Sequence, residues 1–205
     1  MSAEKRRRYE KRRRAENEAE TRLRITEAAV KLHASVGPAK TTVSAVADEA
    51  GVQRATVYRH FPDEDALFAA CSSHWIASNP PPDPSRWASV DGPAERLERA
   101  LDDLYAYYER TERMLENNTR DVALVPALRP SMDAFLAYFD TAAEVLMEGR
   151  RLRGRARARA RAAIGHALAF ETWRSLVRRQ GLRRREAVAL MARLVAEPVS
   201  AGGRG

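Results

Sequence analysis

The stretch that most constrains the fold of this chain is residues 41–61, which reads TTVSAVADEAGVQRATVYRHF. Its apolar residues recur at three- and four-residue intervals and predict one buried face of a short helix: Val43, Val46, Ala47 and Ala50. Thr41 or Thr42 can cap the first free amides of that helix. Gly51 ends it, because a residue without Cβ readily takes the left-handed conformation of a tight turn.

A second helix follows at once, with Val57 and Phe61 facing inward. Its outward side chains are Arg54, Ala55, Thr56, Tyr58, Arg59 and His60. An Arg guanidinium forks onto guanine, Ala and the Thr methyl group meet the thymine methyl group, and Tyr, His and Arg reach phosphate oxygens. The segment therefore predicts a helix-turn-helix whose second helix reads double-stranded DNA. The remaining residues expected at the DNA are Thr41, Thr42 and Gln53.

The run AGVQRATVYRHFPDEDALF, with TTVSAVADE upstream, resembles the DNA-binding signature of the TetR (tetracycline-repressor-like) family of bacterial transcriptional regulators. The resemblance covers roughly residues 25–68. It implies an all-α fold, in which a three-helix DNA-binding domain precedes a helical body that binds a ligand and dimerises. Three positions depart from the family pattern. Gln53 stands where Ser or Thr is usual, His33 where an aromatic ring is usual, and Glu64 in place of a phosphate-contacting Lys.

The composition also favours an all-α protein, because strand-like alternation is scarce and Gly and Pro number only 10 each in 205 residues. No window of 18 apolar residues exists, and the basic N-terminus has no apolar run behind it. We therefore expect a cytoplasmic protein without a membrane span. The single cysteine, Cys71, is expected to be a small core residue.

Enzyme chemistry finds no support in the sequence. The four histidines show no metal-ligand spacing, no Gly-rich phosphate loop is present, and Cys71 has no evident partner base. We expect no catalytic activity, no metal and no cofactor. Two alternatives to a regulator stay open: a non-specific DNA-binding helical protein, and a helical small-molecule-binding protein with a vestigial DNA reader.

The net charge of +8 is concentrated at the N-terminus. Residues 1–14 carry eight basic and two acidic side chains, whereas residues 22–68 carry six of each. Phosphate neutralisation supplies most non-specific affinity for DNA, so we expect this basic arm to contact DNA, either in a minor groove or along the backbone. The alternative is a disordered tail that aids solubility. The arginines expected at the DNA are Arg6, Arg7, Arg8, Arg12, Arg13 and Arg14. Acidic residues that can hold them in the absence of DNA are Glu16, Glu18 and Glu20.

The chain is expected to contain three segments: a basic arm at 1–21, a DNA-binding domain at 22–78, and an effector-binding and dimerisation domain at 79–205. Helical spacing predicts helices over 22–36 and 63–78. The run NPPPDPSRWASVDGP at residues 79–93 holds half of the chain's prolines. It predicts a loop, with Trp87 placed against a helix of the body.

Two predicted body helices carry grouped aromatic and methionine side chains, and a break is expected between them at residues 117–125. The residues alone leave two interpretations open: a plain hydrophobic core, or a pocket for a hydrophobic or aromatic ligand. The TetR resemblance implies the pocket and a small-molecule effector. The expected ligand-binding residues are Tyr105, Tyr108, Met132, Phe135, Phe139 and Phe170.

The C-terminal part shows helical patterns over residues 163–177 and 187–195, behind an arginine-rich run at 150–161 that predicts a loop leading into a helix. The resemblance implies that the last two helices form a four-helix bundle with those of a second copy. The expected dimer contacts are Ile164, Leu168, Leu176, Leu190 and Leu194. Two readers that act together imply a palindromic operator. The expected function is that of a homodimeric, sequence-specific transcriptional regulator, a repressor released from its operator by a small, mostly apolar ligand.

Overall fold

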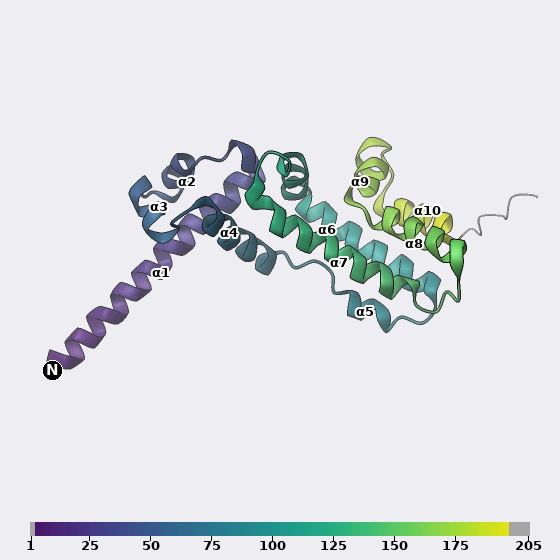
Figure 1. Ribbon diagram of the computed structural model, residues 1–205, viewed down its shortest axis with the longest axis horizontal. Coiled ribbons are helices and arrows are strands. Elements are labelled where there is room, and N and C mark those ends of the chain that lie inside the picture. Colours follow the sequence, from purple (N-terminus) through teal and green to yellow (C-terminus); the bar gives the residue numbers. More distant parts are fainter. Residues whose placement is uncertain (1–2, 197–205) are drawn as a thin grey trace, which may run out of the picture. The chain divides into compact units, whose positions relative to one another are not determined.

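The computed structural model describes residues 3–196, which form helices and turns and contain no strand (Figure 1). This confirms the all-α prediction. The chain divides into two compact units, Met1–Pro80 with Glu116–Ser131, and Pro81–Leu115 with Met132–Gly205. Within the described residues, no helix is both long enough and apolar enough to cross a membrane.

The first unit contains the predicted helix-turn-helix. Its elements are α1 (Ala3–Ser35), η1 (Pro38–Lys40), α2 (Val43–Ala50), α3 (Arg54–His60), α4 (Glu64–Ser78) and η2 (Pro126–Leu128). The Thr42 side chain caps α2 by accepting a hydrogen bond from the amide of Ala45 at 3.1 Å. Gly51 ends α2 in the left-handed conformation, with φ of 65°. The turn between α2 and α3 therefore follows from the residues that predicted it.

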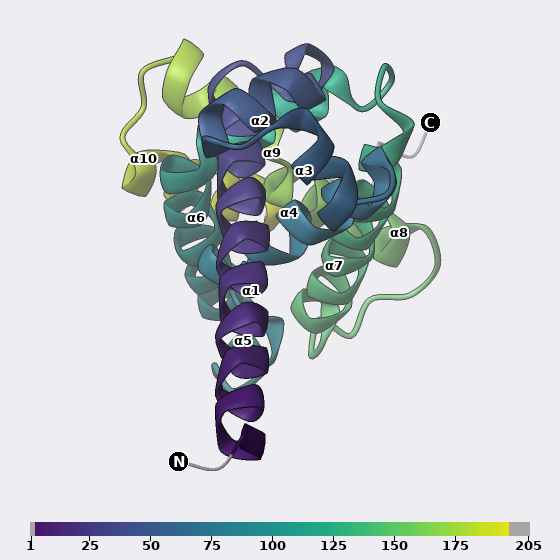
Figure 2. The ribbon, with the colours of Figure 1, turned by 90° about the vertical axis from the view of Figure 1, so that its left-hand side faces the viewer.

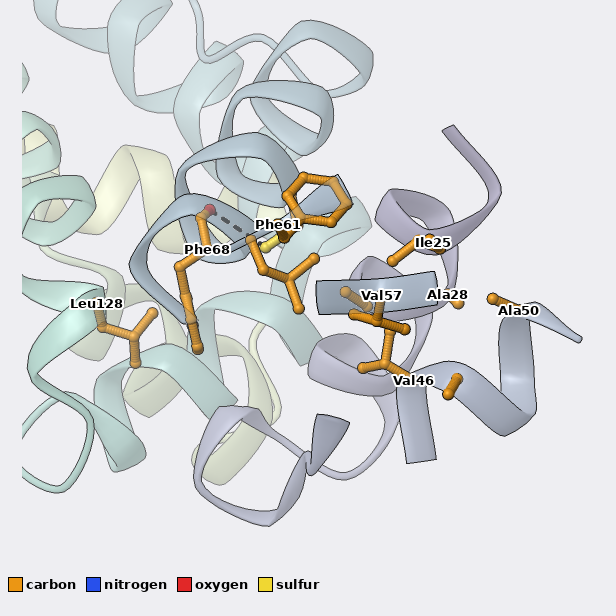
Figure 3. Packing of buried hydrophobic residues seen from close by; sticks show 12 residues of the cluster. Ile25, Ala28, Val46, Ala50, Val57, Phe61, Phe68 and Leu128 are labelled. Atoms are coloured by element: carbon orange, nitrogen blue, oxygen red, sulfur yellow. Dashed lines mark hydrogen bonds between the residues drawn. The ribbon is translucent and has the colours of Figure 1, made fainter. Parts of the chain in front are cut away.

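Apolar side chains from α1, α2, α3 and α4 meet in one core (Figure 3). Ile25, Val46, Val57 and Phe61 are each at most 1% exposed. Leu128, from η2, joins the same core although it stands far along the chain. This core fixes the orientation of α3, whose other face stays in solvent.

Helix α1 is longer than predicted. Helical spacing placed its start at residue 22, but α1 begins at Ala3 and continues unbroken to Ser35 (Figure 2). The segment before residue 22 has no apolar stripe, which is the signal that predicts a helix. It is rich in Ala, Glu, Lys and Arg, which have high helix propensity, and ion pairs four residues apart add to its stability.

The second unit contains most of the remaining helices. They are α5 (Pro84–Ala88), α6 (Pro93–Asp121), α7 (Arg129–Met147), α8 (Gly154–Leu168), α9 (Phe170–Trp173), the π-helix η3 (Arg174–Arg179) and α10 (Arg184–Ala196). Helix α6 ends inside the first unit, and α7 begins there. Only residues 150–153 of the arginine-rich run form the predicted loop, and the rest of the run lies in α8, which begins at Gly154.

Three local predictions in this region need correction. The expected loop at residues 79–93 contains the short helix α5, whose Trp87 donates a hydrogen bond from Nε1 to Asp103 of α6 at 3.1 Å. The expected break at 117–125 is shorter, because α6 continues to Asp121. The single helix expected over 163–177 is interrupted at Ala169, whose ψ of 136° is extended.

Candidate nucleic-acid interface

The outward face of α3 carries the predicted base-reading side chains. Those that are exposed are Gln53, Arg54, Ala55, Tyr58 and Arg59, and Thr56 is half-buried. The face stays free because Val57, which is 1% exposed, turns into the core instead. An exposed helix face with arginine, alanine and threonine can form both the hydrogen bonds and the methyl contacts that a major groove offers.

Arg54 and Tyr58 form a pair on this face, one helical turn apart. Arg54 donates a hydrogen bond from Nη2 to the Tyr58 hydroxyl at 3.1 Å, and its Cζ lies 5.5 Å from the centre of the Tyr58 ring. The same hydrogen bond raises the pKa of Arg54. Tyr58 therefore restricts the direction of the Arg54 guanidinium.

The two threonines before α2 differ in their surroundings. Thr42 is exposed, and its oxygen accepts the capping hydrogen bond from Ala45, so its own hydroxyl proton stays available for a phosphate. Thr41 is half-buried and donates its hydroxyl proton to the carbonyl oxygen of Gly37 at 2.9 Å. Of the two predicted contacts, the surroundings favour Thr42.

His60 is only partly available for its predicted phosphate contact. The ring is half-buried, and its Nε2 atom is shielded from solvent without a hydrogen-bond partner in the described residues. Burial lowers the pKa of His60, and the positive charges of Arg59 and Arg22 lower it further. Because Nε2 is shielded, it cannot donate to a phosphate, which limits the predicted contact to the other nitrogen of the ring.

The basic arm is an exposed helix. Every side chain from residue 6 to residue 20 is exposed. Three arginines pair with acids one turn later: Arg6 with Glu10 at 3.3 Å, Arg12 with Glu16 at 3.2 Å, and Arg14 with Glu18 at 3.5 Å. This confirms the expected role of Glu16 and Glu18. Within this arm, the arginines with no acidic partner among the described residues are Arg7, Arg8 and Arg13.

Sequence reasoning missed two groups of side chains that hold the reader in place. Arg22 of α1 donates a hydrogen bond to the carbonyl oxygen of His60, at the end of α3. This contact spans 38 residues, and no local pattern in the sequence indicates it.

The second group stands at the end of α6 and binds the end of α1. Asn117 donates hydrogen bonds from Nδ2 to the carbonyl oxygens of His33 at 2.9 Å and Ala34 at 3.0 Å. The carboxylate of Asp121, which is 2% exposed, accepts a hydrogen bond from the amide of Ala39 at 2.9 Å. The last turn of α6 therefore stabilises the segment that leads into α2.

The predicted ligand-binding residues fall into two groups. Tyr105 and Tyr108 are fully buried and donate their hydroxyl protons to the carbonyl oxygens of Ala167 at 2.9 Å and Leu168 at 2.6 Å. Phe170 packs edge-on against Tyr108, with ring centres 5.3 Å apart. On α7, the half-buried rings of Phe135 and Phe139 lie 4.7 Å apart, and Met132, also half-buried, precedes them. Burial raises the pKa of Tyr105 and Tyr108, so both remain neutral donors.

The predicted dimer contacts also divide into two sets. Ile164 and Leu168 are fully buried within the chain, so the prediction that they contact a second copy is wrong. Their stripe on α8 is apolar because it faces this chain's own core. Leu176 and Leu190 are half-buried, and Leu194 is 52% exposed. These three line a groove of about 550 Å³ formed by α8, α9, η3 and α10, and therefore remain candidates.

Metal binding finds no geometric basis in the described residues. Among them, no three His, Cys, Asp or Glu side chains come together in a way that could hold a metal ion. The single cysteine, Cys71, is 2% exposed, and burial raises the pKa of its thiol to about 12.

Sequence comparison finds similar bacterial proteins. The family profile described as "Bacterial regulatory proteins, tetR family" matches residues 25–71. A Mycobacterium tuberculosis H37Rv protein named HTH-type transcriptional repressor Rv3405c is 31% identical over 151 residues, which are 73% of this chain and 70% of the relative. A Mycobacterium bovis protein named HTH-type transcriptional regulator Mb3439c matches to the same extent.

Solved structures of regulators share the fold. A TetR-like transcriptional regulator from Rhodococcus sp. RHA1 has a TM-score of 0.62 at 18% identity, over 85% of this chain and 93% of its own. PfmR, a TetR family transcriptional regulator from Thermus thermophilus, has a TM-score of 0.58 at 22% identity, over 83% of this chain and 96% of its own. At these identities the likeness concerns the fold alone.

Proposed function

We propose that this chain is a homodimeric repressor of a palindromic operator. The chain belongs to the tetR family of bacterial regulatory proteins and is a transcriptional regulator. A small, mostly apolar ligand releases it from that operator. It acts in the cytoplasm, where its DNA lies. Residues 1–21 serve as a basic arm, 22–78 as the DNA-binding domain, and 79–205 as the effector-binding and dimerisation domain.

The exposed face of α3 is the observation that carries this proposal. Arg54 is the base-reading residue, Ala55 and Thr56 supply methyl contacts, and Arg59 contacts phosphate. Gln53, Thr42 and His60 contribute further contacts with DNA. The name of the Mycobacterium tuberculosis relative supports repression over activation.

The arm is proposed to follow the phosphate backbone and not the minor groove. An α-helix with its side chains is about 10–12 Å wide. A minor groove of ~6 Å does not admit such a helix. Because the arm is helical, the observation supports a contact along phosphates, with Arg7, Arg8 and Arg13 free to bind them.

The groove formed by α8, α9, η3 and α10 is proposed to receive the same elements of a second copy. Its exposed Leu194 and half-buried Leu176 and Leu190 supply apolar surface for such a contact. Two copies are needed because one reader helix contacts only a few base pairs. A dimer places two readers about 34–36 Å apart, or at a multiple of one helical turn.

The effector is proposed to enter the aromatic region around Tyr105, Tyr108 and Phe170, beside Met132, Phe135 and Phe139 on α7. These side chains suit a hydrophobic or aromatic ligand. Trp173, which stacks on Phe170 with ring centres 5.4 Å apart, has a buried Nε1 without a hydrogen-bond partner among the described residues. A ligand with one acceptor atom would satisfy this donor.

Selection of bound DNA from a random pool tests the central claim. We expect two-fold symmetric sequences, with half-site centres about 10 base pairs apart or at a multiple of that spacing. The basic arm favours a second candidate, a non-specific DNA-binding protein. A pool that stays random after selection, although the protein binds DNA at low salt, would support that candidate and contradict the regulator.

A further inference from the structure

The reader helix α3 is short, and its carboxyl end is held from outside the helix. It has seven residues, and the carbonyl groups of its last residues lack partners within the helix. Arg22 of α1 donates a hydrogen bond from Nη1 to the carbonyl oxygen of His60, the last residue of α3. The guanidinium also places positive charge at the negative end of the α3 dipole, where a cation is stabilising.

A second contact fixes the orientation of the same side chain. The Cζ atom of Arg22 lies 4.0 Å from the centre of the Phe61 ring. Phe61 is 1% exposed and belongs to the core of the first unit (Figure 3). A planar guanidinium at this distance stacks on an aromatic ring. Two consecutive residues at the end of α3 therefore hold Arg22: His60 through its backbone carbonyl group and Phe61 through its ring.

On α1, Arg22 stands where the exposed part of the helix meets the packed part. The side chains of residues 6–20 are all exposed, whereas Ile25 is fully buried. Thr26, one turn after Arg22, donates its hydroxyl proton to the Arg22 carbonyl oxygen at 2.9 Å. One side chain thus connects the helix that carries the basic arm with the helix that reads DNA.

We infer that Arg22 is a positioning residue for DNA recognition, which holds the carboxyl end of α3 on α1 and thereby fixes the reader and the helical arm relative to each other. The inference rests on the proposed function, in which α3 reads bases and the arm contacts phosphates. It differs from a phosphate contact made by Arg22 itself. Such a contact strengthens binding to every sequence and does not change which sequence is preferred.

The test compares Arg22→Gln with Arg24→Gln. Both substitutions remove one positive charge from an exposed position on α1. Arg24 serves as the matched control, because it makes no contact with α3 among the described interactions. Binding to an operator selected with the wild-type protein, and to bulk DNA, is measured at salt concentrations between about 50 and 200 mM, the range over which phosphate contacts weaken strongly.

Arg22→Gln should reduce the preference for operator over bulk DNA by about 10-fold, as expected when a hydrogen bond from a charged donor is lost. Arg24→Gln should keep the wild-type preference. Arg22→Lys should fall between them, because its ammonium can donate to the His60 carbonyl but cannot lie flat on Phe61. Equal preference in all four proteins would overturn the inference.

The salt dependence separates positioning from phosphate binding. Each phosphate contact contributes roughly −0.9 to the slope of log affinity against log salt. We expect the same slope for Arg22→Gln and Arg24→Gln. If Arg22→Gln alone lowers the slope by about one unit per subunit, and weakens operator and bulk DNA equally, Arg22 is a phosphate ligand and the inference fails.

A measurement without DNA tests the contact directly. Spin labels at Ala15→Cys and Ala55→Cys, both exposed positions, report the distance between arm and reader, while the native Cys71 is buried. The distance distribution should broaden in Arg22→Gln and Arg22→Lys but not in Arg24→Gln, with all three folded by circular dichroism. An unchanged distance distribution in Arg22→Gln overturns the inference. If the wild-type protein shows no sequence preference, the proposed function is contradicted, but the distance measurement still tests the Arg22 contact.

Discussion

The basic arm and the reader helix differ in charge, exposure and local support. The arm carries most of the net charge on an isolated, fully exposed stretch of α1, whereas the reader domain has balanced charge and a few outward side chains on a packed core. Charge on an exposed helix contacts phosphates of any sequence, and fixed side chains read bases. We therefore expect affinity and sequence preference to respond to different substitutions.

Deletion of residues 1–14 should give the largest effect. Suppose that the two arms of a dimer together neutralise about six phosphates. When the salt concentration rises from about 50 to 200 mM, the affinity of the wild-type protein for DNA should then fall roughly 10³-fold more than that of the deletion variant. The preference for operator over bulk DNA should stay the same, because Arg22 and α3 are retained. Binding titrations at both salt concentrations measure this. An unchanged slope would show that the arm does not contact DNA.

A milder variant serves as control for the deletion. Arg7, Arg8 and Arg13 replaced together by Gln keep the length and helicity of the arm and remove three arginine charges that have no acidic partner in the described residues. The slope should then fall by about half as much as in the deletion.

Two leucines in the last helices should respond in opposite ways to replacement by arginine. Leu168→Arg places an unpaired charge in the core of the chain, so it should cost about 3 kcal/mol or more and unfold the body. Leu194→Arg, at an exposed position, should keep the helical content but weaken the dimer. Sedimentation and thermal unfolding distinguish the two.

The Leu194 variant also sharpens the comparison between arm and reader. A monomer has one reader and should lose operator preference, while its arm still binds bulk DNA at low salt. If sedimentation shows that the Leu194→Arg variant is still a dimer, the groove formed by α8, α9, η3 and α10 is not the dimer interface.

The stability of the reader should depend on pH through His33. Burial lowers the pKa of His33 to about 4, although Asp121 opposes this. The unfolded chain, with an ordinary pKa near 6.5, therefore binds more protons, and stability falls as pH drops from about 6.5 to about 4. At ~1.36 kcal/mol per pH unit the loss is about 3 kcal/mol.

A His33→Phe variant isolates this contribution. His33 stacks on Phe68 with ring centres 4.7 Å apart, so a phenyl ring can take its place without a titrating nitrogen. Chemical denaturation of the variant should show a much flatter pH profile between about 6.5 and 4. The arm contains no histidine, so its contact with bulk DNA should not follow this profile. A wild-type slope in the variant would contradict the assignment to His33.

The smallest effects concern the paired side chains of α3. Arg54→Ala should relax the preference at one position in each half-site, at ~1–3 kcal/mol for a bidentate base contact. Tyr58→Phe keeps the ring but removes the hydroxyl that accepts from Arg54, so it should reduce the same preference by about 1 kcal/mol. In an Arg54→Ala background, Tyr58→Phe should have no effect on preference. A persisting, sequence-independent loss would instead identify Tyr58 as a phosphate ligand.

The sequence predicts those parts of the fold whose cause is local. The Thr42 cap, the Gly51 turn and the spacing of Val46, Ala50 and Val57 act within a few residues of each other, so they define the helix-turn-helix. The partners of Arg22 and Asn117 cannot be predicted in this way, because they stand 38 and more than 80 residues away.

The body shows a different limit. An apolar stripe on a helix indicates that something covers it, but not whether the cover is the same chain or a second copy. Ile164 and Leu168 therefore matched the dimer prediction although they face their own core. The interruption at Ala169 also lacks a sequence signal, since neither Gly nor Pro stands there.

The end of α6 has a consequence for how such regulators can be recombined. Asn117 and Asp121 satisfy backbone groups of α1 and η1, and Leu128 fills the core beside α4. A reader excised at Pro80 would lose all three side chains, so the DNA-binding half is not an independent folding unit. A chimaera that joins this reader to the body of another regulator should carry residues 116–131 along with the first 80, although residues 81–115 of the second unit stand between these two segments in the sequence.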